Sequence, residues 1–250
     1  MISSIYNLIL IPWLLLAIFS FFFLIKTNAP YGRFSDNNWG ILISYKLGWF
    51  IQEIVSPLTF FYFFIGGIAN KNIISWILCL IWIIHYVNRS IIFPARISNS
   101  SRIPITVIIS AIFFNLINGF INGYYIGNIL NFPSSYLLSM KFITGFIILI
   151  TGFIINISSD EILIKIKKQN IGYQIPKGGL YKYISCPNYF GEIIQWIGFA
   201  VITWSFPALL FVIWTAANLI PRAKAHNSWY KRRFKEKYPK NIKAIFPFIF

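Results

Sequence analysis

One carboxylate in this sequence stands inside an apolar stretch, and its position raises the question of chemistry. The chain has 250 residues but only six Asp and Glu, and Glu53 follows Gln52 within "LGWFIQEIVSPLTFFYFF", residues 47–64. An ionisable group at membrane depth is costly and by default marks a functional site. Burial disfavours the charged carboxylate, so we expect Glu53 to be protonated at pH 7. In that form it can donate a hydrogen bond.

Tyr86, in "IWIIHYVNRS", is predicted to lie at the same depth as Glu53. Glu53 stands about 16 residues before the short turn near Asn70, and Tyr86 about 14 residues after it. With a rise of 1.5 Å per residue, the two side chains differ in depth by about 3 Å on adjacent antiparallel helices. They can therefore share one pocket. Taken singly, Tyr86 is also compatible with an ordinary buried tyrosine, and Glu53 with a structural partner of a polar neighbour.

Further polar residues recur at helical spacing in the second half of the chain. They are Asn156 and Asp160, then Asn188 and Glu192, then Arg222, His226 and Tyr230, while Asn118 lies deeper in its own span. Residues four apart share one face of a helix. As a set they predict a polar cavity for a large anionic ligand. Each alone also fits a capping or packing role, and Asn188 fits a helix N-cap equally well.

Composition indicates the membrane as the setting of these residues. The chain is 57% hydrophobic and only 11% charged, against about 25% charged residues in an ordinary soluble domain. We expect an all-α, multi-pass integral membrane protein forming a single domain over residues 1–250, with the lipid bilayer as its partner. The predicted spans are 5–25, 47–68, 73–93, 104–126, 136–162, 188–205 and 207–221, and Pro207 separates the last two. The first is read as a span rather than a signal peptide.

The distribution of basic residues predicts an orientation for these seven spans. Twenty of the 22 Lys and Arg fall on one side of the predicted topology, and only Lys71 and Lys141 fall on the other. Basic loops favour the cytoplasm. We therefore expect a cytoplasmic C-terminus and an external or lumenal N-terminus. The same count explains the formal charge of +16 without a nucleic-acid partner.

Several other classes of site are absent from the sequence. It contains no G-x-G-x-x-G after a strand, no Walker A sequence, no H-E-x-x-H and no G-x-S-x-G. The histidines are His85 and His226, and the cysteines are Cys79 and Cys186. Their spacing predicts no metal site. His85 inside a span fits a satisfied hydrogen-bond partner better than a catalyst.

The order of motifs resembles the steroid 5α-reductase family. Residues 175–250, beginning "IPKGGLYKYISCPNYFGE", carry the most specific match, which continues upstream through "NISSDEIL", "NGFINGYY", "HYVNRSIIFP" and "WFIQE". The resemblance covers roughly residues 31–250. "NYFGE" by itself also occurs in related membrane sterol reductases and resembles membrane methyltransferases that act on prenylated cysteine.

The resemblance implies a seven-helix membrane bundle that binds NADPH from the cytoplasmic side and reduces the carbon–carbon double bond of a 3-oxo-Δ4-steroid. It assigns Glu53 and Tyr86 to the substrate carbonyl, with Gln52 supporting Glu53. The residues implied for the cofactor are Asn118, Asn156, Asp160, Tyr173, Asn188, Glu192, Arg222, His226, Tyr230, Arg89 and Lys167. Arg102 is a doubtful addition, because residues 95–103 match less well. Lys167 stands where the family more often has arginine, and Ile109 where some relatives have a basic residue, which leaves substrate preference open.

Aromatic residues make up 20% of the chain and can wall a fused-ring substrate. Phe113 and Trp196 are the candidates, although bundle packing and lipid contact explain aromatic residues as well. Other readings stay open: the same chemistry on an enoyl-thioester, polyprenol or sterol, a methyltransferase, or a transporter. We expect a monomer, in the inner membrane of a bacterium or in the endoplasmic reticulum of a eukaryote.

Overall fold

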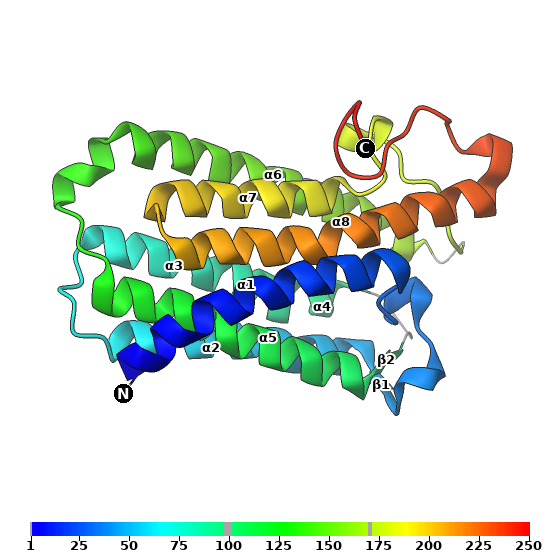
Figure 1. The fold of residues 1–250 in the computed structure, drawn as a ribbon. Coiled ribbons are helices and arrows are strands. Elements are labelled where there is room, and N and C mark those ends of the chain that lie inside the picture. The colour runs from blue at the N-terminus through cyan, green and yellow to red at the C-terminus, as the bar shows by residue number, and fades with distance from the viewer. Residues whose placement is uncertain (1, 98–101, 170–171) are drawn as a thin grey trace. The chain divides into compact units, whose positions relative to one another are not determined.

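The computed structural model describes residues 2–97, 102–169 and 172–250, and helices dominate them (Figure 1). The helices are α1 (Ile2–Lys26), α2 (Tyr45–Ile65), α3 (Ile73–Val87), α4 (Phe93–Arg96), α5 (Ile105–Tyr124), α6 (Met140–Lys168), α7 (Pro187–Thr203) and α8 (Phe206–Phe234). Two short strands, β1 (Leu42–Ser44) and β2 (Arg102–Pro104), pair antiparallel with Ile43 opposite Ile103. Apart from this ribbon, which the sequence analysis did not predict, the all-α architecture is confirmed.

Six helices in the described part of the chain are long and apolar enough to cross a membrane. They include the rod from Ile73 to Arg96, in which a π-helical turn over Asn88–Ile92 joins α3 to α4. α7 has 17 residues and is not among the six. The chain is therefore a multi-pass membrane protein by the length and composition of its helices.

The helix ends differ from the predicted spans at several places, among them the ends of α2, α6 and α8. α2 ends at Ile65, α6 begins at Met140 and runs to Lys168, and α8 continues to Phe234. Pro207 does not separate the last two helices, because it stands in the first turn of α8, where a missing N–H costs nothing. The break lies instead at Trp204, which adopts a left-handed conformation with φ of 45°.

The chain packs as two compact units, each with its own contacts. The first contains residues 1–12 and 29–143, and the second contains residues 13–28 and 144–250. Helix α1 contributes to both, so the chain does not divide at a linker. The single domain expected over residues 1–250 stays a prediction.

The first unit is built on the close parallel packing of α2 and α5. A Cβ added to Gly123 of α5 would collide with the main chain of Phe60 on α2, and its neighbours Gly119 and Gly127 make the same approach one turn away. Small residues at such positions let two helix backbones touch inside a membrane, where packing replaces the hydrophobic effect. The same proximity brings polar side chains of the two helices within reach of each other.

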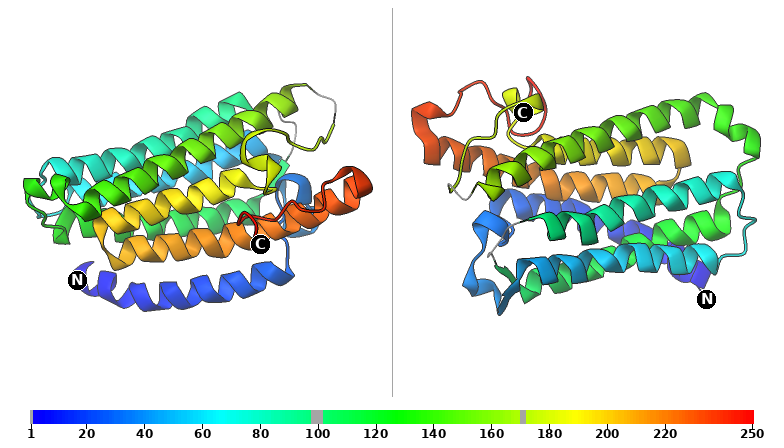
Figure 2. Two further views of the ribbon diagram at one scale, coloured as in Figure 1. Left: turned by 90° about the horizontal axis from the view of Figure 1, so that it is seen from above. Right: turned by 180° about the vertical axis from the view of Figure 1, so that it is seen from behind.

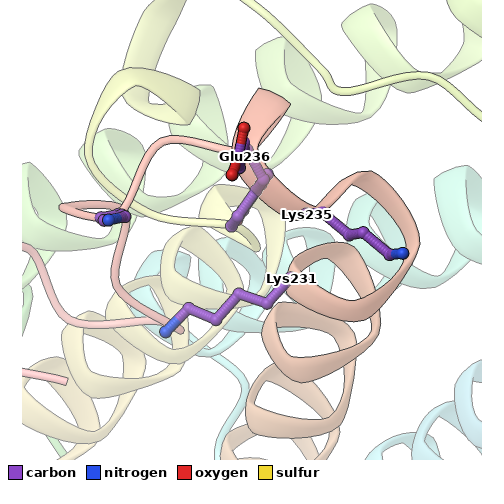
Figure 3. Close-up of a pocket in the computed structure, with 5 residues that line it drawn as sticks. Lys231, Lys235 and Glu236 are labelled. Carbon is purple, nitrogen blue, oxygen red and sulfur yellow. The ribbon is translucent and has the colours of Figure 1, made fainter.

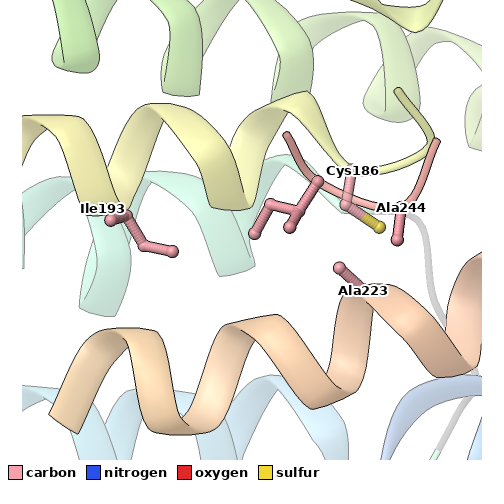
Figure 4. Close-up of a cluster of buried hydrophobic side chains, with 5 residues drawn as sticks. Cys186, Ile193, Ala223 and Ala244 are labelled. Carbon is pink, nitrogen blue, oxygen red and sulfur yellow. The ribbon is translucent and has the colours of Figure 1, made fainter. Parts of the chain in front are cut away.

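The second unit is built on α6, α7 and α8, which lie side by side in that order (Figures 1 and 2). α6 and α7 run antiparallel, with Gly152 of α6 against Gly191 of α7. On the other side of α7, Cys186, Ile193, Ala223, Ala244 and Ile245 form a buried cluster with α8 and the tail (Figure 4). Trp214 of α8 holds α1 by donating its indole N–H to the carbonyl oxygen of Trp13 at 3.1 Å.

Candidate active site

Tyr86, Gln52 and Asn115 form one hydrogen-bonded group in the first unit. The Tyr86 hydroxyl donates to Asn115 Oδ1 at 3.5 Å, and Asn115 Nδ2 donates to the main-chain oxygen of Gln52 at 2.7 Å. Tyr86 and Asn115 are each 3% exposed. Asn115 therefore joins α3, α5 and α2 at one level. The depth arithmetic placed Tyr86 level with Glu53, and the structure joins Tyr86 through this asparagine to the main chain of Gln52, the residue before Glu53. A shared pocket of Tyr86 and Glu53 stays a prediction.

The expected burial of Glu53, from which its protonation was argued, is only partial in the structure. Gln52 is buried, whereas Glu53 is partly exposed, and Gln52 Nε2 donates to Glu53 Oε1 at 3.4 Å. This bond orients the carboxyl group relative to α2. The family resemblance assigned Gln52 the role of supporting Glu53, and this hydrogen bond is compatible with that role.

Three buried polar atoms on one face of α2 have no hydrogen-bond partner among the described residues. They are Trp49 Nε1, Gln52 Oε1 and Ser56 Oγ, on residues spaced by three and four. Buried polar atoms without a partner are uncommon and mark places where a water or ligand belongs. The face that carries Gln52 therefore has donors and acceptors to offer to a polar group of a bound molecule.

Arg89 lies on the π-helical turn after Tyr86 and is held by aromatic rings. Its guanidinium carbon is 5.0 Å from the centre of the Trp49 ring and 5.3 Å from that of Phe93. Such cation–π contacts fix a charged group where few anions are available. A π-turn is a frequent feature of functional sites.

In the second unit, α6 and α7 meet through three polar side chains. Asn156 Nδ2 donates to the main-chain oxygen of Asn188 at 2.9 Å, and Asn188 Nδ2 donates to Asp160 Oδ1 at 3.0 Å. Asn156 and Asp160 are both buried. Asn188 is not the N-cap of α7, because Cys186 holds that position and Pro187 begins the helix. The Asn188 side chain therefore does not cap α7 and instead bridges the two helices.

Arg222, His226 and Tyr230 lie on one stripe of α8, as their spacing predicted. Arg222 and His226 are 7% and 8% exposed, and Tyr230 is buried too. Arg222 Nε donates to the hydroxyl oxygen of Tyr189 at 3.1 Å, and the same oxygen lies 3.5 Å from His226 Nε2. Tyr189 therefore links α7 to the stripe.

Tyr181, in the loop before α7, contacts α6 next to the polar side chains that join α6 and α7. Its hydroxyl donates to the main-chain oxygen of Ser159 at 3.3 Å, next to Asp160. Burial raises the pKa of Tyr181 well above its usual value, and the nearby charge of Asp160 adds to the effect. The phenol consequently stays neutral through the physiological range.

Asn227 fastens the tail that follows α8. Its Nδ2 donates to the main-chain oxygens of Ile242 and Lys243 at 3.2 and 3.0 Å. Ser185 Oγ at 3.4 Å and Tyr238 Oη at 3.5 Å are further acceptors. The tail is thereby held against the start of α7.

The remaining predicted residues fall in varied settings. Asn118 is fully buried and donates to the Phe114 carbonyl of its own helix, whereas Phe113 is 53% exposed on the same helix. Trp196 is buried and packs on Phe199 and Phe211.

The other cofactor candidates are more exposed. Tyr173 is 54% exposed, and the centre of its ring lies 4.9 Å from that of Trp229. Glu192 is partly buried, and Lys167 is exposed. Arg89 and Asn118 belong to the first unit and the other nine cofactor candidates to the second. The weakly matched segment 95–103 includes residues 98–101, which lie outside the described part of the chain.

Sequence reasoning missed Asn115, Tyr189, Tyr181 and Asn227. Asn115 had a signal, because Asn115, Asn118 and Asn122 are buried on one face of α5 at spacings of three and four. Tyr189 stands inside "NYFGE", where the motif drew attention to its neighbours. Tyr181 and Asn227 acquire their partners only through the folded loop and tail, so nothing local identified them.

The fold and the two polar groups define a multi-pass membrane protein with buried donors at two places. Comparison with known proteins then gives the family. The family described as 3-oxo-5-alpha-steroid 4-dehydrogenase matches residues 101–250. The steroid 5-alpha-reductase DET2 of Arabidopsis thaliana is 41% identical over 89% of this chain and 88% of its own length.

Two further relatives agree with that assignment. The DET2 protein of Gossypium hirsutum is 38% identical over 89% of both chains. The 3-oxo-5-alpha-steroid 4-dehydrogenase 1 of Rattus norvegicus is 35% identical over 90% of this chain and 87% of its own. The chain therefore belongs to the 3-oxo-5-alpha-steroid 4-dehydrogenase family, and it is an oxidoreductase acting on CH–CH bonds.

Proposed function

We propose that this chain reduces the Δ4 double bond of 3-oxo-Δ4-steroids to give 5α-reduced 3-oxo-steroids, with NADPH as the reductant. Family membership supports the reaction, and its relatives carry the names of steroid 5-alpha-reductases. The observation that carries the site assignment is the buried contact of Tyr86 with Asn115, which also binds the main chain of Gln52.

The proposed role of Tyr86 and Glu53 is to hold the negative charge that develops on the steroid carbonyl oxygen. In the proposed complex the Tyr86 hydroxyl turns its single proton from Asn115 Oδ1 to the steroid oxygen. Protonated Glu53 supplies the second hydrogen bond to that oxygen. A donor of this kind contributes about 2.7–4 kcal/mol to the stability of such a transition state. Gln52 orients the Glu53 carboxyl through the bond at 3.4 Å. Asn115 holds the Tyr86 ring in position by its contacts to α3 and α2.

The residues of the second unit fit a nucleotide by their chemistry. Arg222 is a cation, and Asn156 and Asn188 are neutral amides. Tyr230 offers a hydroxyl, because its ring is already stacked on Tyr238. Asp160 already accepts a bond from Asn188. Arg222 and His226 would hold phosphate groups, and the amides would bind the sugar or the carboxamide. When bound, NADPH would supply the hydride for the carbon β to the carbonyl, and a proton from water would complete the reduction at the α-carbon.

We extend the proposal to a seven-span topology with the C-terminus in the cytoplasm. α7 is about 25 Å long at 1.5 Å per residue, within the range that crosses a hydrocarbon core. The basic residues then gather on the cytoplasmic side, where a soluble cofactor is available. The chain acts as a monomer in the bilayer, without nucleic acid, in an inner membrane or in the endoplasmic reticulum.

Purified protein tests the proposal when it is mixed with NADPH and a 3-oxo-Δ4-steroid. We expect NADPH oxidation with formation of the saturated 3-oxo-steroid. Glu53→Gln and Tyr86→Phe should each lower turnover by roughly 10²–10³-fold while leaving NADPH binding intact. Tyr86→Phe removes the hydrogen-bond donor, and Glu53→Gln replaces an acidic O–H by an amide N–H, which is a far weaker acid. Asp36→Asn, the same kind of change as Glu53→Gln at an exposed site, is the control and should retain turnover.

Two results would contradict this assignment. Unchanged turnover in Glu53→Gln would show that the reaction needs no acidic proton at that residue. Bound NADPH that no steroid oxidises would reassign the substrate to another lipid, such as an enoyl-thioester or a polyprenol derivative.

A further inference from the structure

The last turn of α8 and the residues after it carry an unusual density of positive charge. Residues 231–240, named here the basic segment, contain six Lys and Arg and one acidic residue, Glu236, for a formal net charge of +5. All seven charged side chains are exposed. None of the six basic residues belongs to the polar stripe of α8, so the proposed binding site leaves this charge unexplained.

The basic segment surrounds an open cavity of about 440 Å³. Its lining consists of Lys231, Lys235, Glu236, Tyr238 and Lys240. Figure 3 shows the side chains of Lys231 and Lys235 leaving the chain in different directions, with their amines apart. Such an arrangement makes a broad positive field and does not clamp a single phosphate.

The cavity adjoins the stripe that is proposed to bind the nucleotide. Tyr230, the last residue of the stripe, directly precedes Lys231, and its ring stacks on Tyr238 with centres 5.5 Å apart. Along the helix axis Lys231 lies about 14 Å from Arg222. The field of the segment therefore reaches Arg222 at low ionic strength, where the screening length is about 30 Å, and is largely screened there at about 0.1 M salt, where the length is about 10 Å.

The helix geometry favours an anion in solution over a lipid headgroup as the partner. Lys231 stands ten residues beyond Pro221, which is about 15 Å along the axis from the end of the apolar part of α8. Headgroups occupy only about 5–8 Å beyond the hydrocarbon core on each side. Lys231, at the start of the basic segment, thus lies past them in water.

We propose that the basic segment steers NADPH toward its site, raising the rate of association without holding the bound cofactor. This inference rests on the proposed function. NADPH carries a pyrophosphate and a further phosphate on one ribose, so it is strongly anionic. Charges of one sign gathered at the mouth of a site raise the association rate of a ligand of opposite charge by about 10–10³-fold in total, and salt removes the effect.

Stopped-flow measurement of NADPH binding to the full chain in nanodiscs of neutral lipid tests this steering. The variant Lys231→Gln, Lys235→Gln and Lys240→Gln should associate about 10-fold more slowly at about 20 mM salt. The deficit should shrink to less than about two-fold at about 0.5 M salt, and the dissociation rate should stay unchanged. Glu236→Gln should associate faster than the unmodified protein, because it removes the one negative charge.

A matched control removes three exposed lysines from elsewhere in the chain. Lys26→Gln, Lys46→Gln and Lys141→Gln lose the same charge at dispersed positions, and their association rate should change by less than about two-fold. NADH, which lacks the ribose phosphate, should show a weaker salt dependence than NADPH in the unmodified protein.

Three results would overturn the inference, and they separate it from the proposed function. Faster dissociation with unchanged association would make the lysines contacts of the bound cofactor. An equal loss in the control variant would assign the effect to total charge. Absence of NADPH binding to the unmodified protein at any salt concentration would refute the proposed function itself.

Discussion

Gly191 is the position at which one methyl group should disturb the candidate nucleotide site most directly. A Cβ at this residue of α7 would lie 2.5 Å from the main-chain nitrogen of Asn156 and 2.7 Å from the main-chain oxygen of Gly152, both on α6. Ordinary contacts of a methyl group are about 3.5–4.0 Å. Gly191→Ala should therefore push α7 about 1 Å away from α6.

That displacement is sufficient to break the bonds between the two helices. The Asn156–Asn188 bond of 2.9 Å and the Asn188–Asp160 bond of 3.0 Å would lengthen beyond hydrogen-bonding distance. Each costs about 1 kcal/mol, and overpacking costs about 1–3 kcal/mol more. The better helix propensity of alanine returns about 1 kcal/mol. The free energy of unfolding should fall by about 2–4 kcal/mol.

Thermal unfolding in detergent and NADPH titration measure the two consequences. At about 2–4 °C per kcal/mol for a chain of this size, Gly191→Ala should lower the Tm by roughly 5–15 °C. It should also weaken NADPH binding. The control is Gly66→Ala, where the nearest atom is the Tyr62 oxygen at 3.2 Å, and its Tm should change by less than about 2 °C. An unchanged or raised Tm in Gly191→Ala would refute the close-packing argument.

Two further variants test contacts in the same unit. Because the pKa of Tyr181 is raised above its value in the unfolded chain, the stability that Tyr181 contributes is complete below about pH 10 and declines above it. Tyr181→Phe should remove that decline in a pH series of unfolding curves. An equal loss of stability at alkaline pH in the variant would assign the decline to other groups. Asn227→Ala should lower the free energy of unfolding by about 2–3 kcal/mol, since it leaves two main-chain carbonyls of the tail without their donor. Limited proteolysis should then cleave the tail sooner. An unchanged cleavage rate would show that Asn227 does not hold the tail in place.

Long apolar runs and helical arithmetic made much of this fold predictable. Six of the predicted spans coincide with helices that have membrane length, because runs of twenty apolar residues admit few other structures. The common rise of all α-helices gave Tyr86 a depth close to that of Glu53, and Tyr86 is joined through Asn115 to the neighbouring Gln52. The same regularity placed Arg222, His226 and Tyr230 on one buried stripe.

The unpredicted features depend on contacts between distant residues. The pairing of Ile43 with Ile103 and the bridge through Asn115 join segments about 60 residues apart, for which a local pattern carries no information. α8 passes Pro221 without stopping because tertiary contacts bury Arg222 and His226 beyond it. The roles assigned to Glu53, Tyr86 and the cofactor residues stay predictions until they are assayed.

The connection between α7 and α8 has a consequence for biosynthesis. Only Trp204 and Ser205 separate the two helices; Trp204 turns the chain with a left-handed conformation, and Ser205 Oγ accepts from the Ala208 N–H. A linker of two residues cannot cross a bilayer or wait as a separate loop. We therefore expect the translocon to release α7 and α8 into lipid together as a hairpin, with the short α7 entering only once α8 has been made.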